Sequence, residues 1–565
     1  MLASAVRRLV VIGVGLALAG SIVLVAPAAS AAPSAKPAPS SAPRLNWSPC
    51  FHEISAFTET AYQCALANVP LDYDSPNGTA VGLSLVRIPA RDPAHKIGTI
   101  FLNPGGPGGS GVEFALFFGP SVEFVWGSEV RDRFDVVGFD PRGVGRSTAL
   151  RCFGNLGQAT RAFAPFAFPL TPDDEALVAA GDRLLAEQCA LRGNKVRDHM
   201  STANVARDLD LLRAAVGDAQ LTFVGLSYGT FLGNTYANMF PELVRAVVID
   251  GVLDPVAWVN VEAEIPFSTR LRSDAGAQVT IERFFELCDE AGASCSFGPD
   301  SQVRYAALAD RLRVDGPVLV TDPFTGEEFP FGYTDLIGNT LGALYDPFSY
   351  SFLADFLTTL EGSPPAAIDA AFADLARTNG LISKRGFPRY PNFVESFPAV
   401  ACEDSNNPTD YAVWSQQGAL ADQSSYFGRL WTWASSPCAQ WPLVDSDRFT
   451  GTFDHVTSNP VLVIGNLYDP ATRYEGAVGV ADMLPNAALL TVDVPGHTSL
   501  GSSVCAGVLT GSYLLDPSVA ASIDGYVCPK EFNPFEIAVD PSSTSGLQRE
   551  VRHQLLPILA GTPGT

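Results

Sequence analysis

The pentapeptide around Ser227 has the residue types and the spacing that a serine nucleophile needs. Residues 225–229 read Gly-Leu-Ser-Tyr-Gly and lie between an apolar run at 221–224, which predicts a strand, and a segment at 230–237, which predicts a helix. In a nucleophile elbow, this sharp turn from strand to helix accepts only glycines at the two flanking positions, here 225 and 229, and exposes the serine hydroxyl at the top of a parallel sheet. An ordinary glycine-rich turn is the alternative, and the flanking strand and helix favour the nucleophile.

A glycine-rich loop upstream has the composition of an oxyanion site. A predicted strand at 98–102 runs into residues 103–111, Asn-Pro-Gly-Gly-Pro-Gly-Gly-Ser-Gly. Glycines let a backbone N–H approach a developing oxyanion, and hydrolases with a nucleophile elbow place one donor on the loop after their third strand. A phosphate-binding loop is excluded, because the Gly-Lys-Ser/Thr ending is absent and two prolines remove N–H groups. A purely structural turn is the other alternative, although a turn requires fewer residues.

Two later strand ends carry an acid and a base. The apolar runs at 460–465 and 488–494 predict buried strands, followed by Asp469 and His497 respectively. Polar residues just beyond the carboxyl ends of strands lie at the edge where sites form in open α/β sheets. The chain order Ser, Asp, His is the order that elbow hydrolases use. We therefore predict a catalytic triad of Ser227, Asp469 and His497.

Other acids and histidines fit these roles less well. Asp250 and Asp254 follow the predicted strand at 245–249. We prefer Asp469 because it lies one strand–helix unit before the candidate base, whereas Asp254 adjoins a proline where the chain leaves the core. The remaining histidines lie in polar contexts or away from strand ends: His52, His95, His199, His455 and His553.

The elements that position these residues alternate between strand and helix from residue 81 to about residue 253. Strand patterns occur at 81–88 and 133–139, and a helical pattern occurs at 202–216, where Thr202 is placed to cap the helix and Gly217 to end it. This alternation predicts the α/β class, with a mostly parallel, doubly wound sheet that has helices on both faces.

The chain between the two parts of this sheet is too long for a connection. About 200 residues with mostly helical periodicity separate Asp254 from Pro460, far beyond the length of ordinary loops. We predict a first part of the core at 46–255, an inserted cap domain at 256–455, and a C-terminal part of the core at 456–565.

The N-terminus has the features of an export signal. Two arginines precede an apolar stretch at 9–25 and small residues at 29–31, so we predict a signal peptide at 1–31, followed by a flexible leader at 32–45. A retained membrane anchor is the alternative, and three glycines in the stretch weaken it. The net charge is −24, and it becomes −26 without the signal. A chain this acidic repels nucleic acid and anionic membrane surfaces. We predict a secreted or cell-wall-associated protein with no stable membrane anchor after signal cleavage.

The ten cysteines form an even set, for which disulfides are the default in an exported protein. No Cys-x-x-Cys occurs and histidines are few, so we predict no metal site and no cofactor. Neighbour pairing is the simplest connectivity: Cys50–Cys64, Cys152–Cys189, Cys288–Cys295, Cys402–Cys438 and Cys505–Cys528.

Three motifs and one helical stretch resemble the secreted tripeptidyl-aminopeptidase branch of the prolyl-aminopeptidase-type α/β-hydrolases: NPGGPGGSG at 103–111, DPRGVGRS at 140–147, GLSYGT at 225–230, and the helix at 202–217. The segment around Asp469 and His497 is similar to the TAP-like C-terminal region of that branch, and the resemblance spans about residues 46–530. It implies the α/β-hydrolase fold with an inserted, mainly helical cap domain.

The resemblance also implies the oxyanion donors. They are the backbone N–H groups of Gly106, the second glycine of the GGPG string, and of Tyr228, which follows the nucleophile. Some relatives carry a histidine before the glycines. Pro104 stands in that place here, so no role of that histidine carries over.

The activity that the resemblance implies is a serine exopeptidase that releases short peptides, above all tripeptides, from free N-termini through an acyl-enzyme. Such an enzyme must bind an ammonium group, for which a carboxylate is the natural partner. Glu403 and Asp404, late in the predicted cap, are the candidates for substrate binding. A solvated acidic pair without a role is an equally weighted alternative.

Two other functions compete with this interpretation. A secreted carboxylesterase would use the same triad, because the fold does not choose between esters and amides. A non-catalytic cell-wall or adhesion protein on a hydrolase scaffold is the alternative outside enzymes. A binding protein has no need of serine, acid, base and oxyanion loop together, which disfavours the second alternative.

Overall fold

The computed structural model describes residues 42–536, except 261, 263, 322–327, 363–391 and 442–444. The predicted signal peptide at 1–31 lies outside the described residues, as do most of the predicted leader and the last part of the C-terminal segment, 537–565.

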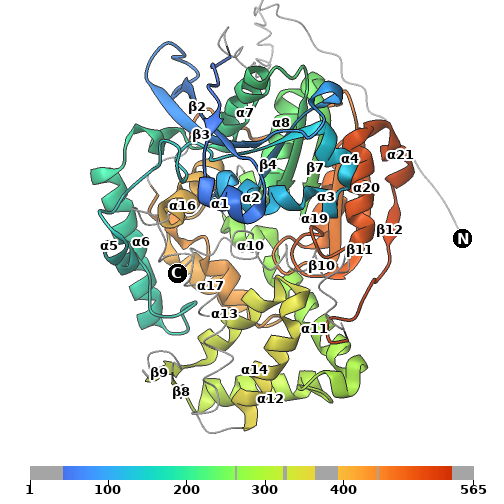
Figure 1. The fold of residues 1–565 in the computed structure, drawn as a ribbon. Helices are drawn as coiled ribbons and strands as arrows, with labels where there is room; N and C mark the ends of the chain where they lie inside the picture. The colour runs from blue at the N-terminus through green and yellow to red at the C-terminus, as the bar shows by residue number, and fades with distance from the viewer. Residues whose placement is uncertain are drawn as a thin grey trace, which may run out of the picture. The chain divides into compact units, whose positions relative to one another are not determined.

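A ten-stranded sheet frames the described part of the chain (Figure 1). From β5 to β12 all neighbours are parallel, whereas β1, β2, β3 and β5 pair antiparallel. Each strand predicted from the sequence is present, and the mostly parallel sheet is confirmed. The strands, in their order across the sheet, are β1 (Ser48–Pro49), β2 (Gln63–Pro70), β3 (Ala80–Ile88), β5 (Phe134–Phe139), β4 (Gly98–Asn103), β6 (Leu221–Leu226), β7 (Val244–Asp250), β10 (Val461–Tyr468), β11 (Ala487–Pro495) and β12 (Tyr526–Cys528).

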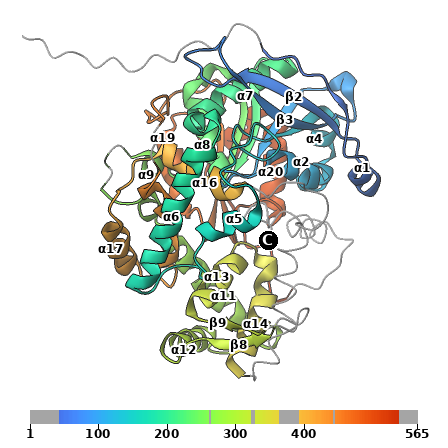
Figure 2. The same ribbon diagram turned by 90° about the vertical axis from the view of Figure 1, so that its left-hand side faces the viewer.

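Helices cover both faces of this sheet, which makes it doubly wound as predicted (Figures 1 and 2). Successive strand side chains point to opposite faces, so in β10 Val463 joins one hydrophobic core and its neighbours Leu462 and Ile464 join the other. The first core includes residues of α7 (Thr202–Val216), α8 (Tyr228–Met239) and α19 (Tyr474–Met483). The second includes residues of α2 (Gly111–Phe118), α3 (Val122–Val125), α4 (Ser128–Arg133), α20 (Val504–Leu515) and α21 (Ala520–Ile523).

Helix α7 has the predicted bounds but a different N-terminal cap. Gly217 ends the helix with a φ of 89°, as predicted. Thr202 is the first helical residue rather than the cap, and Ser201 before it makes no side-chain capping bond. The Thr202 N–H instead donates to the carboxylate of Asp404, 2.8 Å away and 202 positions along the chain. A long-range contact therefore replaces the local cap that the sequence suggested.

The segment between β7 and β10 is mainly helical, as predicted, and adds a two-stranded sheet of β8 (Val318–Thr321) and β9 (Glu328–Phe331). Helices α11 to α14 lie together beyond one edge of the large sheet (Figures 1 and 2) and share a third hydrophobic core. The helices are α9 (Pro255–Val259), α10 (Phe267–Leu271), α11 (Ser273–Ala291), α12 (Ser301–Val314), α13 (Tyr333–Leu344), α14 (Tyr350–Gly362), α16 (Phe393–Asp404), α17 (Tyr411–Ala421) and α18 (Gly428–Trp433).

Helix α6 (Pro172–Arg192), which the sequence assigned to the core, packs against this inserted segment. The Tyr411 hydroxyl donates to Asp182 at 3.0 Å, and Arg429 pairs with Glu175 at 3.1 Å. Among the described residues, the remaining α-helices are the shorter α1 (His52–Thr58) and α5 (Leu156–Ala159). The division of the chain at 255 and 455 therefore stays a proposal. We propose that α6 belongs to the cap as well, although it precedes residue 255.

All five predicted disulfides are present and together use the ten cysteines. This is the state expected of a protein folded in an oxidising compartment. Within the described part of the chain, none of the helices combines the length and the apolar character that a membrane span requires.

Candidate active site

Ser227 occupies a sharp turn between the end of β6 and the start of α8. Its φ of 56° and ψ of −126° are rare for a residue with a side chain and mark a backbone that its surroundings hold in place. Both flanking glycines are sterically required: a Cβ on Gly225 would lie 2.2 Å from the Gly229 carbonyl oxygen, and one on Gly229 would lie 2.8 Å from that of Asn103. The predicted elbow geometry is thus present.

The glycine-rich loop after β4 packs directly on this turn. A Cβ on Gly105 would lie 2.9 Å from the Ser227 Cβ and 3.0 Å from the Tyr228 backbone nitrogen. The next residue, Gly106, lines the same cavity as Ser227. Tyr228 is the first residue of α8, so its N–H has no acceptor within the helix. The two predicted oxyanion donors therefore lie on adjoining segments beside the serine.

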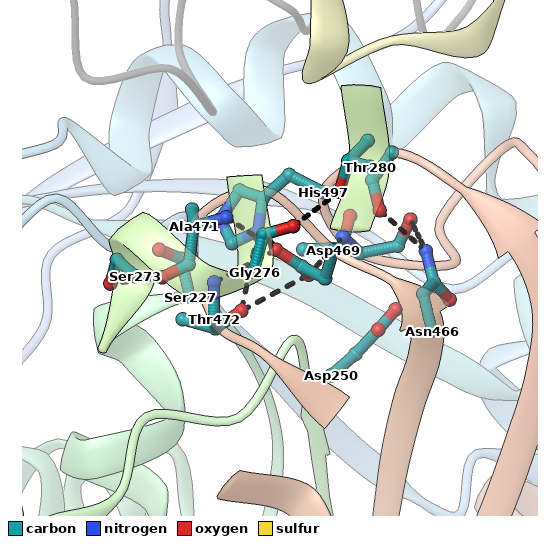
Figure 3. A network of polar contacts seen from close by, with 12 residues as sticks. Ser227, Asp250, Ser273, Gly276, Thr280, Asn466, Asp469, Ala471, Thr472 and His497 are labelled. Atoms are coloured by element: carbon teal, nitrogen blue, oxygen red, sulfur yellow. Dashed lines mark hydrogen bonds and ion pairs between the residues drawn. The ribbon is translucent and has the colours of Figure 1, made fainter. Parts of the chain in front are cut away.

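Asp469 and His497 meet at the carboxyl edge of the sheet. The His497 Nδ1 lies 3.0 Å from each carboxylate oxygen of Asp469, and both side chains are buried. Figure 3 shows Ser227, Asp469, Thr472 and His497 in one cluster. Burial disfavours the charged form of Asp469, but His497 and the N–H groups of Ala471 and Thr472 outweigh it and hold the pKa of Asp469 below its ordinary value. An ionised carboxylate at Nδ1 is the arrangement that orients a catalytic imidazole.

Two residues that sequence reasoning missed complete the surroundings of His497. The Thr472 hydroxyl lies 3.1 Å from the Asp469 Oδ2 and 3.3 Å from the His497 Nδ1. The backbone carbonyl oxygen of Tyr345, in the inserted segment, accepts the His497 backbone N–H at 2.9 Å. The ring of Tyr345 packs edge-on against the imidazole, with 5.0 Å between the ring centroids. The Asp-x-x-Thr spacing could have suggested Thr472, but nothing local in the sequence identifies Tyr345.

The rival acids make other hydrogen bonds. The Asp250 carboxylate accepts the backbone N–H and the hydroxyl of Ser499, each at 2.9 Å. Asp254 caps α9, accepting the N–H of Val256 at 2.9 Å. The geometry therefore favours Asp469 as the partner of the histidine.

A cavity of about 320 Å³ opens beside Ser227 and Gly106. Its wall is mostly apolar and comes largely from the inserted segment, with aromatic side chains at Trp258, Phe267, Tyr345, Phe393, Phe397 and Trp431. The charged residues of the wall are Asp254 and Arg473. Such a cavity suits a short, apolar acyl group.

Glu403 and Asp404 do not line this cavity. Both are buried at the end of α16, so the interpretation of a solvated acidic pair is wrong. Glu403 accepts the Met200 N–H at 2.8 Å, and burial together with Asp445 raises its pKa well above the ordinary value. Burial raises the pKa of Asp404 to about 7 against the hydrogen bonds that it accepts from Thr202 and Trp258. Asp404 is linked to the cavity wall through Trp258, whose Nε1–H donates to its carboxylate.

One group of potential metal ligands occurs among the described residues. Carboxylate oxygens of Asp72, Asp74 and Asp447 lie within 4.8 Å of one another. None of these residues lines the Ser227 cavity, and attack by an activated serine needs no metal.

Comparison with known proteins identifies the families of both core parts. Residues 98–268 match the alpha/beta hydrolase fold, and residues 424–528 match the TAP-like protein family. The chain is 32% identical to the serine protease Hip1 of Mycobacterium tuberculosis over 82% of this chain and 86% of that protein. It is 29% identical to the tripeptidyl aminopeptidase of Streptomyces lividans over 85% of this chain and 84% of that protein. It is 32% identical to carboxylesterase B of Mycobacterium tuberculosis, over 83% and 88% respectively.

Proposed function

Because the chain belongs to the α/β-hydrolase family with a TAP-like C-terminal region, we propose that it is a secreted serine aminopeptidase that releases short peptides, above all tripeptides, from free N-termini. The observation that carries the proposal is the cluster of Ser227 with the Asp469–His497 pair, next to a cavity of about 320 Å³ with a mostly apolar wall. The five disulfides support export.

In the proposed reaction the Ser227 hydroxyl attacks the scissile carbonyl. His497 takes the serine proton at Nε2 and returns it to the leaving amine, while Asp469 holds Nδ1 and stabilises the imidazolium. The N–H groups of Gly106 and Tyr228 stabilise the oxyanion. Water then attacks the acyl-enzyme with the same base, releasing the N-terminal peptide and restoring Ser227.

The proposed division of labour follows the two parts of the chain. The core at 46–255 and 456–565 supplies the triad, and the cap at 256–455 supplies most of the cavity wall. An exopeptidase must also hold the substrate ammonium group, for which there are two candidate partners. One is the predicted pair, Glu403 and Asp404, and the other is Asp254, the carboxylate residue among those that line the cavity.

The partner of the ammonium group can be identified by substitution. Losing a charge-assisted hydrogen bond costs about 1.5–3 kcal/mol, so we expect about a 10- to 100-fold lower kcat/KM for unblocked peptides and little change for acetyl-blocked ones. Glu403→Gln, Asp404→Asn and Asp254→Asn would be compared on both substrates. The variant that loses discrimination identifies the anchor. If all three still discriminate, the anchor lies elsewhere.

A carboxylesterase is the second candidate, supported by the relative of that name and by the apolar cavity wall. The two functions separate when one acyl group is offered both as an anilide and as an ester. An aminopeptidase cleaves both and requires the free N-terminus, whereas an esterase cleaves only the ester and ignores blocking.

A further inference from the structure

Helix α16 of the inserted segment contacts the loop that carries one proposed oxyanion donor, and it is linked to the other donor through Thr202. Its first turn packs closely against the glycine-rich loop. A Cβ on Gly106 would lie 3.3 Å from the Phe393 ring, and one on Gly108 would lie 2.6 Å from the Ser396 hydroxyl. The start of this helix therefore forms one wall of the loop that presents the Gly106 N–H.

The other end of α16 reaches the second donor through a buried chain of hydrogen bonds. The Asp404 carboxylate accepts the Thr202 backbone N–H at 2.8 Å and the Thr202 hydroxyl at 2.6 Å. The Thr202 hydroxyl is in turn hydrogen-bonded to the hydroxyl of Tyr228. All three side chains are at most 4% exposed, so water does not compete for these bonds.

The same carboxylate also holds a wall of the cavity. The Trp258 Nε1–H donates to the Asp404 Oδ2 at 3.3 Å. The Trp258 ring lines the cavity and lies 5.8 Å from the ring of Tyr228. One buried oxygen thus fixes two aromatic side chains: Tyr228, through Thr202, and Trp258 in the cavity wall.

Helix α16 is itself anchored at both ends. Asn392, just before the helix, donates to the carbonyl oxygens of Gly143 at 2.7 Å and Leu150 at 2.8 Å. Cys402, near its end, forms a disulfide with Cys438. These contacts restrain α16 at both ends, so the helix can hold the residues that it contacts in fixed positions.

We propose that Asp404 is a positioning residue of the active site, which acts through Thr202 to fix Tyr228, and with it the oxyanion N–H, and through Trp258 to fix the cavity wall. The assignment of that N–H rests on the proposed function. This positioning role of Asp404 differs from the ammonium binding considered above, and it fits a residue that is not among those lining the cavity.

The two roles leave different kinetic signatures. An oxyanion donor acts in the transition state, so its displacement lowers kcat and leaves KM nearly unchanged. Removing such a donor costs about 10²- to 10³-fold in kcat. Displacing one costs less, and we expect about a 10- to 100-fold loss for Asp404→Ala. Loss of an ammonium anchor would instead lower kcat/KM for unblocked peptides alone.

The test uses the full-length protein and five variants: Asp404→Ala, Asp404→Asn, Tyr228→Phe, the double variant Asp404→Ala/Tyr228→Phe, and Asp182→Asn as the control. Asp182 is a buried carboxylate that accepts a tyrosine hydroxyl but does not line the cavity. Each variant is first checked for a cooperative melting transition. Then kcat and KM are measured on unblocked and acetyl-blocked peptides, together with the rate at which a fluorophosphonate labels Ser227 with loss of fluoride. That rate needs the oxyanion donors but no particular natural substrate.

We expect Asp404→Ala to lower kcat and the labelling rate together, Asp404→Asn to recover most of the loss, and Asp182→Asn to change neither. Tyr228→Phe keeps the fold and removes only the end of the chain of hydrogen bonds. Its effect in the Asp404→Ala background should be much smaller than alone, since both act through one network. Three results would overturn the proposal. In the double variant, the losses of Asp404→Ala and Tyr228→Phe could multiply. Folded Asp404→Ala could label within twofold of the wild-type rate, or its loss of activity could be confined to unblocked peptides. If the wild-type protein is labelled rapidly but cleaves no peptide, the proposed aminopeptidase activity is wrong. The labelling rates of the variants would still test the positioning role of Asp404.

Discussion

The edge of the large sheet and the inserted segment build the candidate site in different ways. At the edge, Ser227, Asp469 and His497 each lie within a few residues of a strand end, and the strands themselves fix their spacing. The insert places its side chains through contacts between distant parts of the chain, such as the bond from Thr202 to Asp404 across 202 positions. The sheet thus positions the proposed catalytic side chains, whereas contacts between distant parts of the chain determine the shape of the cavity. Damage to the edge should abolish the reaction, whereas damage to the insert should change its rate and selectivity.

The largest effect is expected at the nucleophile. Ser227→Ala removes the attacking oxygen, and we expect kcat to fall by about 10⁶-fold while the melting temperature stays near that of wild type. Active-site labelling and peptide hydrolysis measure this directly. Near-normal turnover by the folded variant would show that Ser227 is not the nucleophile.

The orienting acid comes next. Asp469→Asn keeps the shape of the side chain but no longer selects the tautomer of His497, so we expect about a 10⁴-fold loss of kcat. Asp254→Asn serves as the comparison on an acetyl-blocked substrate or an ester, where an ammonium anchor has no part. A mild effect of Asp469→Asn together with a severe effect of Asp254→Asn would assign the role of orienting acid to Asp254.

Breaking one disulfide in each region sharpens the contrast. Cys402–Cys438 joins α16 to the turn at 436–439 within the insert, and Cys505–Cys528 joins α20 to β12 of the sheet. Replacing either pair by alanine should cost about 2–4 kcal/mol of stability, measured by denaturant unfolding. Only the first should also lower kcat or raise KM in the protein that remains folded. Equal kinetic damage from the second pair would mean that the two regions are not separable.

The smallest effect concerns pH. Burial raises the pKa of Asp404 to about 7 in the folded protein from an ordinary value of 3.8, so the folded state keeps a proton that the unfolded state has lost between these values. Raising the pH across that window therefore favours unfolding, by at most about 1.4 kcal/mol per pH unit for one group.

Asp404→Asn lacks this proton. Its stability should therefore fall less than that of wild type between about pH 4 and pH 7, and in parallel with it above pH 7, as followed by urea unfolding at each pH. The carboxylates of Glu403 and Asp445 and the cation of Arg448 face the same region and remain in both proteins. Parallel curves throughout the window would mean that Asp404 is ionised in the folded state.

The sequence predicts the edge of the sheet far better than the insert, for a physical reason. Strand periodicity and the glycines around Ser227 are local, and the geometry of parallel strands brings their carboxyl ends together. The environment of Asp404 depends on packing between distant segments. The sequence suggested a solvated or substrate-binding acid, yet Asp404 accepts the first N–H of α7, the helix that Thr202 was expected to cap. Tyr345 and the placement of α6 were missed because no short-range pattern encodes them.

Product analysis tests the central claim most directly. A peptide with a free N-terminus and its acetylated twin would be incubated with the purified protein and with Ser227→Ala, and the products identified by mass spectrometry. The proposed function predicts that wild type releases the N-terminal tripeptide from the free peptide only, and that the variant releases nothing. Equal cleavage of both peptides, or hydrolysis confined to esters, would contradict it.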